Sequence, residues 1–238
     1  MERFDRVKLL IGESALEKLT KSSVVIFGVG GVGGYTAEAL VRSGVGNITI
    51  FDSDVVAKSN INRQIIATEN TVGLDKVEVL KQRLLSINPS VKVTAYKEFY
   101  LPENADKYSF DGYDYVVDAV DTVTAKTEII MRAKKANVRV ISCMGTGGKI
   151  DPTMLKVSDI AKTQGCPLAR VMRKQLKDRG ISGVKVVYSP EERILCNDEI
   201  ATAEKTHAGR VAPASMIFVP ATAGLLLAKE VVFDIIGE

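Results

Sequence analysis

Short apolar runs alternate with amphipathic segments through the first two thirds of the chain. The run at residues 22–28 is rich in β-branched residues and ends in glycine, which is typical of a buried parallel strand. Residues 33–44 place Ala37, Leu40 and Val41 on one face of a helix and end in a glycine stop. Similar patterns predict strands at residues 47–54, 91–99, 113–121 and 138–145, and helices at residues 73–89 and 124–137.

This alternation predicts an α/β fold with a doubly wound, mostly parallel sheet of the Rossmann-like type. We expect residues 1–148 to form the main domain and residues 149–238 to form a smaller C-terminal extension of the same compact unit. The extension mixes short strands with a basic helix after Pro167, a polar stretch and a final apolar segment. Pro220 and three charged residues interrupt that segment, which favours a buried or subunit-interface helix over a stable membrane span.

Composition restricts the classes of function only weakly. The formal charge of +3 over 238 residues does not by itself indicate nucleic acid, so a basic surface has to be argued locally. The three cysteines are far apart and form no C-x-x-C pair, which argues against a disulfide framework and against a cysteine-rich zinc site. Charges throughout the N-terminal segment leave no uninterrupted apolar core of the signal-peptide kind, and unpaired cysteines suit a reducing compartment, so we expect a cytoplasmic protein.

A glycine loop follows the first predicted strand. Gly28, Gly30 and Gly33 form the pattern G-x-G-x-x-G between a strand and a helix, where backbone N–H groups and the helix dipole favour a phosphate. Asp52 ends the next strand, at the spacing where a carboxylate binds ribose hydroxyls. These features predict a nucleotide site, but they do not distinguish a nicotinamide cofactor from ATP.

Residues further along the chain favour ATP. Transfer of an adenylyl group releases pyrophosphate, whose charge must be met by cations and a metal ion. Asn60, Arg63 and Lys76 follow Asp52 and are suited to the triphosphate. Asp121 follows a strand at the ligand side of the predicted sheet, where its carboxylate is suited to Mg²⁺.

Together, the motifs "GVGGVGG", "SGVGNITIFDSDVV", "SNINRQ", "VGLDK", "INP" and "DAVD" resemble the ubiquitin-activating-enzyme-like adenylating family. The resemblance covers about residues 3–148 and implies a homodimer that binds ATP with Mg²⁺ and adenylates a carboxylate. It implies that Arg6 acts in the opposite subunit's site. It further assigns phosphate contacts to Gly30, Gly31 and Gly33, the ribose to Asp52, the triphosphate to Asn60, Arg63 and Lys76, and the metal to Asp121.

The second half resembles one branch of that family, the tRNA threonylcarbamoyladenosine dehydratases. The likeness lies in "SCMGTGGKIDPTMLKVSDIAKT" and "PLARVMRKQLKDRGI", and more loosely in the final apolar segment. On the helix after Pro167, helical periodicity puts Arg170, Arg173, Lys174 and Lys177 on one face, and Leu168, Val171, Met172 and Leu176 on the other. A cationic face of this kind suits RNA phosphates.

The branch implies a reaction that needs no enzyme thiol. The substrate nucleoside carries a free threonine carboxylate, and the carbamoyl group beside it can close a five-membered ring once the carboxylate is adenylated. We therefore expect no zinc and treat Cys143 as a core residue, and Cys166 and His207 as incidental. Whether a sulfur-transfer protein assists is left open by the sequence.

Three alternatives remain at this level. The protein could adenylate the C-terminus of a ubiquitin-like sulfur-carrier protein, although many such enzymes carry the cysteine pairs that are missing here. It could be a non-catalytic nucleotide-binding scaffold. A nicotinamide dehydrogenase is the most distant alternative, because its chemistry has no use for cations at a leaving pyrophosphate.

Overall fold

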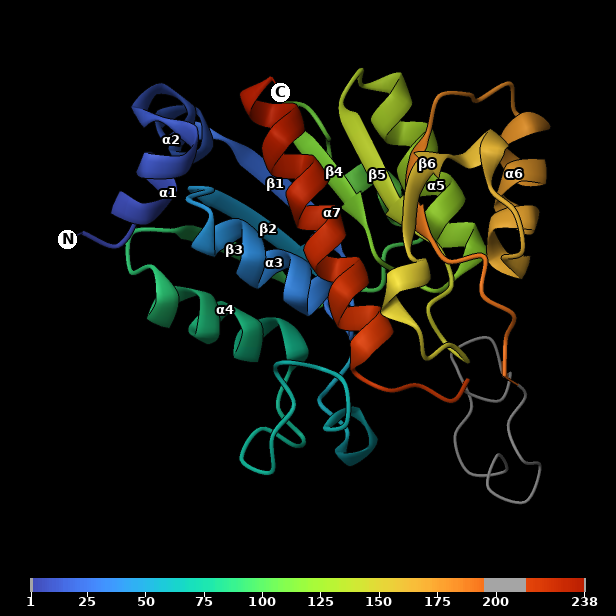
Figure 1. Cartoon of the computed structure of the whole chain (residues 1–238), viewed down its shortest axis with the longest axis horizontal. Helices are drawn as coiled ribbons and strands as arrows, with labels where there is room; N and C mark the ends of the chain where they lie inside the picture. Colours follow the sequence, from blue (N-terminus) through green and yellow to red (C-terminus); the bar gives the residue numbers. More distant parts are fainter. Residues whose placement is uncertain (1, 195–212, 238) are drawn as a thin grey trace.

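The computed structural model describes residues 2–194 and 213–237, and the strands in this part form one seven-stranded sheet (Figure 1). The strand order is β3-β2-β1-β4-β5-β7-β6, and only β6 runs antiparallel to its neighbour. The predicted doubly wound α/β fold is thereby confirmed. The strands are β1 (Ser23–Phe27), β2 (Asn47–Phe51), β3 (Lys92–Tyr96), β4 (Tyr115–Asp118), β5 (Arg139–Cys143), β6 (Lys156–Asp159) and β7 (Lys185–Tyr188).

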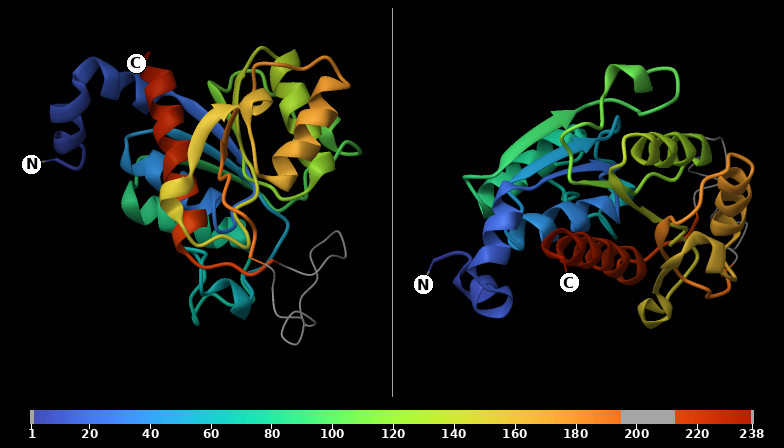
Figure 2. Two further views of the ribbon diagram at one scale, coloured as in Figure 1. Left: turned by 45° about the vertical axis from the view of Figure 1, so that its right-hand side comes forward. Right: turned by 90° about the horizontal axis from the view of Figure 1, so that it is seen from above.

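Helices cover both faces of the sheet, as the view from above in Figure 2 shows. They are α1 (Asp5–Ile11), α2 (Glu13–Lys21), α3 (Gly33–Arg42), α4 (Lys76–Ile87), α5 (Val123–Lys135), α6 (Pro167–Lys177) and α7 (Phe218–Ile236). Helices α3, α4 and α7 pack on one face, and α5 and α6 pack on the other. Because successive side chains of a strand point to opposite faces, Val24 and Ile26 of β1 join the first core, and Val25 and Phe27 join the second.

The C-terminal helix α7 is packed directly against the start of α3. A Cβ atom on Gly224 would lie 2.5 Å from the Val32 carbonyl oxygen, so only glycine allows this approach. The Thr36 hydroxyl donates to the Gly224 carbonyl oxygen at 3.1 Å across the same contact. Pro220 does not interrupt the helix, because it lies in the first turn, where a missing N–H costs no helical hydrogen bond. The end of the chain therefore supports the helix that follows the glycine loop.

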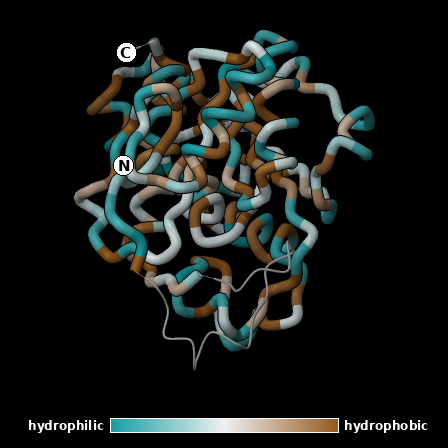
Figure 3. Tube along the Cα trace, turned by 90° about the vertical axis from the view of Figure 1, so that its right-hand side faces the viewer, coloured by the Kyte–Doolittle hydropathy of each residue, from teal (hydrophilic) through white to brown (hydrophobic). Residues whose placement is uncertain are grey.

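One side of the apolar helix α7 is buried in the core. Among the described residues, no helix combines the length and the apolarity that a membrane span requires. Figure 3 shows hydrophobic and hydrophilic stretches alternating along the helices of the fold. The buried side of α7, which includes Ala223, Leu227 and Val231, belongs to the core on the face of the sheet that α3 and α4 also cover.

The N-terminal helices form a corner at the edge of the molecule (Figure 1). Helix α1 has no buried residue, and Leu9 and Leu10 are 76% and 83% exposed. Arg3 donates to the Asn88 side chain, which lies just before β3 at the amino edge of the sheet. Helix α1 is thus placed away from the carboxyl ends of the strands.

An ionic network ties the last turns of α7 to the amino ends of the strands. The Lys185 ammonium contacts Asp234 at 2.7 Å and Glu230 at 3.0 Å, and the Tyr115 hydroxyl donates to Asp234 at 2.6 Å. Burial works to raise the pKa of Asp234, but the hydrogen bonds from Lys185 and Tyr115 outweigh it and leave that pKa below its ordinary value. The pKa of Glu230 is lowered in the same way, against burial, by Lys229 and Lys185.

This network predicts how stability depends on pH. A carboxyl group whose pKa is lowered by folding stabilises the protein above its unfolded pKa, and that contribution is lost as the pH falls through the folded pKa. Lys185→Met should therefore lower the free energy of unfolding at pH 7 by on the order of 1 kcal/mol and flatten its decline below about pH 4. Urea unfolding at neutral and acidic pH measures both effects. Parallel pH profiles for the variant and the wild type would contradict the assignment.

Candidate nucleotide site

The glycine loop connects β1 to α3, and two of its glycines are required by the fold itself. Gly28 has a φ of +85°, and a Cβ atom there would lie 2.8 Å from the Ala119 carbonyl oxygen. A Cβ atom on Gly33 would lie 1.8 Å from the Gly28 carbonyl oxygen. These two positions need glycine because the backbone of the loop folds back on itself and against the turn after β4.

The other two glycines of the loop are not required by packing. A Cβ atom on Gly30 would meet nothing closer than the Gln64 side-chain nitrogen at 3.6 Å, and one on Gly31 would meet Arg63 and Pro220 at 3.5 Å. These are ordinary contacts, so the protein could accommodate alanine at either position. Their missing side chains leave space at the N-terminus of α3, where Val32 provides no side-chain cap. That space is suited to a phosphate.

Asp52 lies directly after β2 and contacts the glycine loop. Its carboxylate accepts hydrogen bonds from the backbone N–H groups of Val29 at 2.8 Å and Asp54 at 2.9 Å. Burial raises the pKa of Asp52, with the Lys76 charge and the two backbone donors acting against that rise. The carboxylate is therefore fixed in orientation beside the loop, at the carboxyl end of β2.

Lys76 begins α4 and is buried next to two acids. Its ammonium is 2.6 Å from Asp54 and 4.0 Å from Asp52. An antiparallel bridge between Val55 and Asp75 brings the start of α4 back to the end of β2. The sequence predicted Lys76 at the site, but it did not indicate Asp54, whose only signal is its place two residues after Asp52.

Asn60 and Arg63 belong to a short turn that includes a 3-10 helix, Lys58–Asn60. The Asn60 side-chain oxygen accepts a hydrogen bond from the Ala57 backbone N–H at 3.1 Å, so this buried amide shapes the turn. Arg63 lies against Gly31, and its guanidinium donates to the Ser59 carbonyl oxygen at 2.9 Å. The turn thus places the backbone and the first part of the Arg63 side chain beside the open part of the glycine loop.

Gln64 is a site residue to which the sequence analysis gave no role. Its side chain is buried beside Gly30, and its amide oxygen has no hydrogen-bond partner among the described residues. A buried amide without its partners is unusual, and it often marks a position where water or a ligand completes the bonding. The motif "SNINRQ" contained this residue, but composition alone does not distinguish it from a structural amide.

Asp121 lies in the turn that follows β4 and is exposed. The Thr122 hydroxyl donates to its carboxylate at 3.2 Å. Within residues 2–194 and 213–237, no three histidine, cysteine or acidic side chains cluster closely enough to hold a metal. A single exposed carboxylate near a phosphate site fits Mg²⁺, which usually keeps water and phosphate ligands and needs few from the protein.

The structure brings most of the predicted nucleotide site together. The glycine loop, Asp52 and Lys76 are joined by contacts through the Asp52 carboxylate, and Arg63 touches Gly31. The turn that carries Asp121 packs on Gly28 and Gly33 through Ala119. Arg6 is the exception, because it lies on α1 at the outer corner of the molecule, away from its own glycine loop (Figure 1).

The basic helix α6 lies at the opposite end of the sheet from α1 (Figure 1). Arg170, Lys174 and Lys177 are exposed, whereas Arg173 is half-buried and donates to the Thr163 carbonyl and hydroxyl oxygens, both at 2.6 Å. The prediction for Val171 was wrong. It was placed on the apolar side of the helix but is 41% exposed, and Ala169 is buried in its stead beside Met172 and Leu176.

The cysteines in the described part of the chain are buried. Cys143 lies in the core, as predicted, and burial raises the pKa of its thiol to about 12. Cys166 was predicted to lie in a loop; it directly precedes α6, and its side chain is enclosed. A protonated, enclosed thiol is a poor nucleophile. Cys196 and His207 lie outside the described residues.

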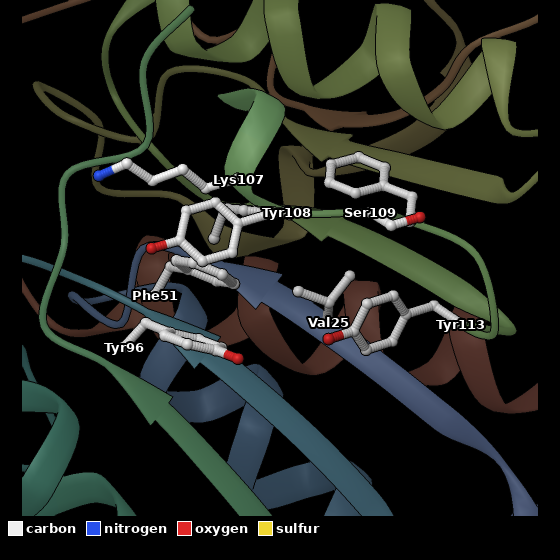
Figure 4. Close-up of a pocket in the computed structure, with 9 residues that line it drawn as sticks. Val25, Phe51, Tyr96, Lys107, Tyr108, Ser109 and Tyr113 are labelled. Carbon is white, nitrogen blue, oxygen red and sulfur yellow. The ribbon is translucent and has the colours of Figure 1, made fainter. Parts of the chain in front are cut away.

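A separate small cavity of about 120 Å³ lies on the sheet face next to β1, β2 and β3 (Figure 4). Aromatic side chains line it, including Phe51, Tyr96 and Tyr108, and burial raises the pKa of Tyr108 to about 12. None of the predicted site residues lines this cavity. It is therefore distinct from the nucleotide site.

The chain is similar to a known protein family and to several of its members. A model of the ThiF family matches residues 4–237, almost the whole chain. The tRNA threonylcarbamoyladenosine dehydratase of Bacillus subtilis is 40% identical over 244 residues, which cover 100% of this chain and 96% of that relative. The Escherichia coli enzyme of the same name is 40% identical over 198 residues, 80% of this chain and 74% of that relative.

Solved structures agree with these sequence relatives. The Escherichia coli tRNA N6-threonylcarbamoyladenosine dehydratase in complex with ATP superposes with a TM-score of 0.87 at 35% identity, covering 99% of this chain and 94% of that chain. Its complex with AMP gives a TM-score of 0.89 at 34% identity over the same shares of the two chains. With a family match from end to end and this identity to its members, the chain belongs to the ThiF family.

Proposed function

We infer that the protein is an ATP-dependent tRNA threonylcarbamoyladenosine dehydratase. The observation that carries this inference is the similarity to dehydratases across both halves of the chain. A sulfur-carrier adenylyltransferase would share the glycine loop and Arg63, but the likeness to the dehydratases extends through α6 and α7. The similarity along the whole chain, rather than the nucleotide site, therefore separates the two functions.

The chain's own residues are arranged to hold ATP. The N-terminus of α3 and the space at Gly30 and Gly31 receive phosphate groups, and Asp52 lies at the carboxyl end of β2 for the ribose. Arg63 and Lys76 supply positive charge for the triphosphate and the departing pyrophosphate. Lys76 must exchange its contact with Asp54 for the nucleotide, so the acid holds the lysine in place until ATP arrives.

Asp121 is the residue that would hold Mg²⁺. When bound, the ion would neutralise charge on the phosphate oxygens. Asp121 is exposed and sits in the turn packed on the glycine loop, so its carboxylate is available close to the phosphates.

The reaction proceeds in two steps on the substrate. The threonine carboxylate attacks the α-phosphorus of ATP, forming an acyl–phosphate bond and releasing pyrophosphate. The carbamoyl group of the same nucleoside then attacks the activated carbonyl carbon, loses a proton, and expels AMP as the ring closes. The net change in the nucleoside is the loss of one water, and the intramolecular nucleophile makes an enzyme thiol unnecessary.

This chemistry is consistent with the chain's cysteines. Cys143 and Cys166 are enclosed by protein, and no step requires either thiol. No step requires a sulfur-transfer protein. We place the reaction in the cytoplasm, where free thiols are kept reduced.

We further propose that the active unit is a homodimer with shared sites. Helix α1 packs only at the edge of the molecule, on α2 and through the partly buried Ile11, and it leaves Leu9 and Leu10 exposed. Arg6 lies on the same helix and is remote from its own glycine loop. A second copy that covers α1 would explain both features, with Arg6 serving the partner's triphosphate site.

The exposed basic side chains of α6 are the proposed contact with tRNA. Arg170, Lys174 and Lys177 point away from the core on one helix. Arg173 anchors that helix to Thr163 through its guanidinium, so it contributes to the position of the helix as well as to its charge.

The first test of this function is product formation. Incubation with ATP and tRNA that contains threonylcarbamoyladenosine, followed by digestion to nucleosides, should yield a nucleoside lighter by one water. Arg63→Ala and Asp121→Asn should lower kcat/KM by about 100-fold or more, because each removes charge that the departing pyrophosphate needs. Arg42→Ala, an exposed arginine at the far end of α3, is the matched control and should stay close to wild type. If the Arg63 and Asp121 variants formed product at the wild-type rate, the roles proposed for these two residues would be refuted.

The second test concerns the shared site. Arg6→Ala and Arg63→Ala should each be nearly inactive alone. When they are mixed and allowed to exchange subunits, roughly a quarter of wild-type activity should return, since half the dimers then carry one intact site. If Arg6 served its own subunit, the mixture would remain inactive.

The third test concerns the basic helix. Replacing Arg170, Lys174 and Lys177 by alanine should raise the KM for tRNA. It should also make tRNA binding less sensitive to salt, because the slope of log K against log salt concentration falls by about one for each lost phosphate contact. The dissociation constant for ATP should not change. Alanine at Lys92, Lys107 and Lys135 removes the same charge from exposed positions elsewhere and serves as the control. Equal losses in the two triple variants would show that α6 has no special role.

A further inference from the structure

A fully buried ion pair lies between β4 and α5. The Lys126 ammonium is 2.9 Å from the Asp118 carboxylate, and both side chains are 0% exposed. The Ser142 hydroxyl, from β5, donates to the same carboxylate oxygen at 2.5 Å and lies 3.4 Å from the Lys126 nitrogen. None of these three residues was predicted to belong to the site.

Stability alone does not account for this network. Removing two charges from water costs several kcal/mol per ion, and well-packed apolar side chains often serve equally well. Lys126 also lies near the start of α5, which begins at Val123, so its positive charge faces the positive end of the helix dipole. The role of this network is therefore better judged from the segment that it holds in place, which is the turn after β4.

The network holds the turn that follows β4. The second oxygen of the Asp118 carboxylate accepts a hydrogen bond from the Val120 backbone N–H at 3.2 Å. Within the same turn, the Ala119 carbonyl oxygen lies 2.8 Å from the position of a Cβ on Gly28, and the Ala119 side chain lies 3.3 Å from that of a Cβ on Gly33. One carboxylate thus fixes a turn that touches both structural glycines of the phosphate loop.

The same turn leads into the exposed end of the site. Asp121 follows Val120 directly, and Thr122 then begins α5 as its N-cap residue. Lys126 reaches back from the second turn of that helix to Asp118. A shift of this turn would move the glycine loop and Asp121 together.

We propose that Asp118, Lys126 and Ser142 are positioning residues. They fix the glycine loop and Asp121 in the relative position that binding of ATP and Mg²⁺ requires. They do so from the interior, without touching the nucleotide. This inference rests on the proposed ATP-dependent function, and it adds a set of residues on which nucleotide affinity depends.

The test measures nucleotide binding by titration calorimetry on the full chain, with ATP in the presence of Mg²⁺ and again in EDTA. Lys126→Met and Ser142→Ala should weaken ATP binding by about 3- to 30-fold, with the smaller effect in Ser142→Ala, which leaves the ion pair intact. If Lys126→Met fails to fold, Ser142→Ala carries the test. Unchanged dissociation constants in a folded variant under both conditions would overturn the proposal.

A matched control separates positioning from general destabilisation. Lys185→Met removes a lysine from the ionic network with α7, on the opposite face of the sheet from α5, and it should lower the Tm without changing the dissociation constant for ATP. A loss of affinity in Lys185→Met equal to that in Lys126→Met would show that the effect is only loss of stability, and it would also overturn the proposal.

A double-mutant cycle tests the link to Asp121. Ser142→Ala should reduce the Mg²⁺-dependent part of ATP affinity less in the Asp121→Asn background than in the wild type, because both changes act on one site. Fully additive losses would contradict this link. Product formation from tRNA is measured separately, so that wild-type protein which binds ATP with Mg²⁺ but forms no cyclised nucleoside would refute the proposed function and leave the positioning network standing.

Discussion

Three stretches of backbone meet at the carboxyl ends of β1 and β4, and the small Ala119 side chain is the one that reaches into the contact. The Gly28 carbonyl occupies the space where Gly33 would carry a Cβ, and Ala119 closes against both glycines. This close packing fixes the first turn of α3 relative to β4. Because Gly30, Gly31 and Asp121 lie close to this contact in sequence, the geometry of the proposed nucleotide site depends on it.

Parts of the chain far from the glycine loop in sequence support the same contact. Helix α7 packs Gly224 on Val32, and its Pro220 lies against Gly31, so the C-terminal helix completes a wall of the loop. On the other side, the acids at the end of β2 hold Lys76 close by. The loop and its surroundings are thus built from the beginning, middle and end of the chain.

Much of this arrangement could be predicted from the sequence. Strand and helix alternate with clear periodicity up to residue 148, and the glycine loop has a fixed place in that alternation, so the sheet and most of the nucleotide site followed. The family and its ATP-dependent dehydratase branch were also predicted, and the comparisons with known proteins confirm them. The roles of individual residues toward ATP, Mg²⁺ and tRNA stay predictions.

What could not be predicted depends on contacts between distant segments. Lys126 sits in a helix pattern as an ordinary charged residue, and only the fold shows that it is fully buried on Asp118. Val171 follows the apolar period of α6, but it is 41% exposed, and Ala169 is buried instead. Gln64 and Asp54 gain their importance from neighbours supplied by other loops. Such effects have no signature in local periodicity.

The two kinds of glycine in the loop have a consequence for the evolution of this fold. Gly28 and Gly33 are held by the shape of the protein, whereas Gly30 and Gly31 are free of any steric demand from it. In a descendant that kept the architecture but abandoned nucleotides, drift would reach the second pair first, since no folding penalty would oppose it. Packing of the fold therefore does not explain glycine at positions 30 and 31, whereas the phosphate proposed for this loop does.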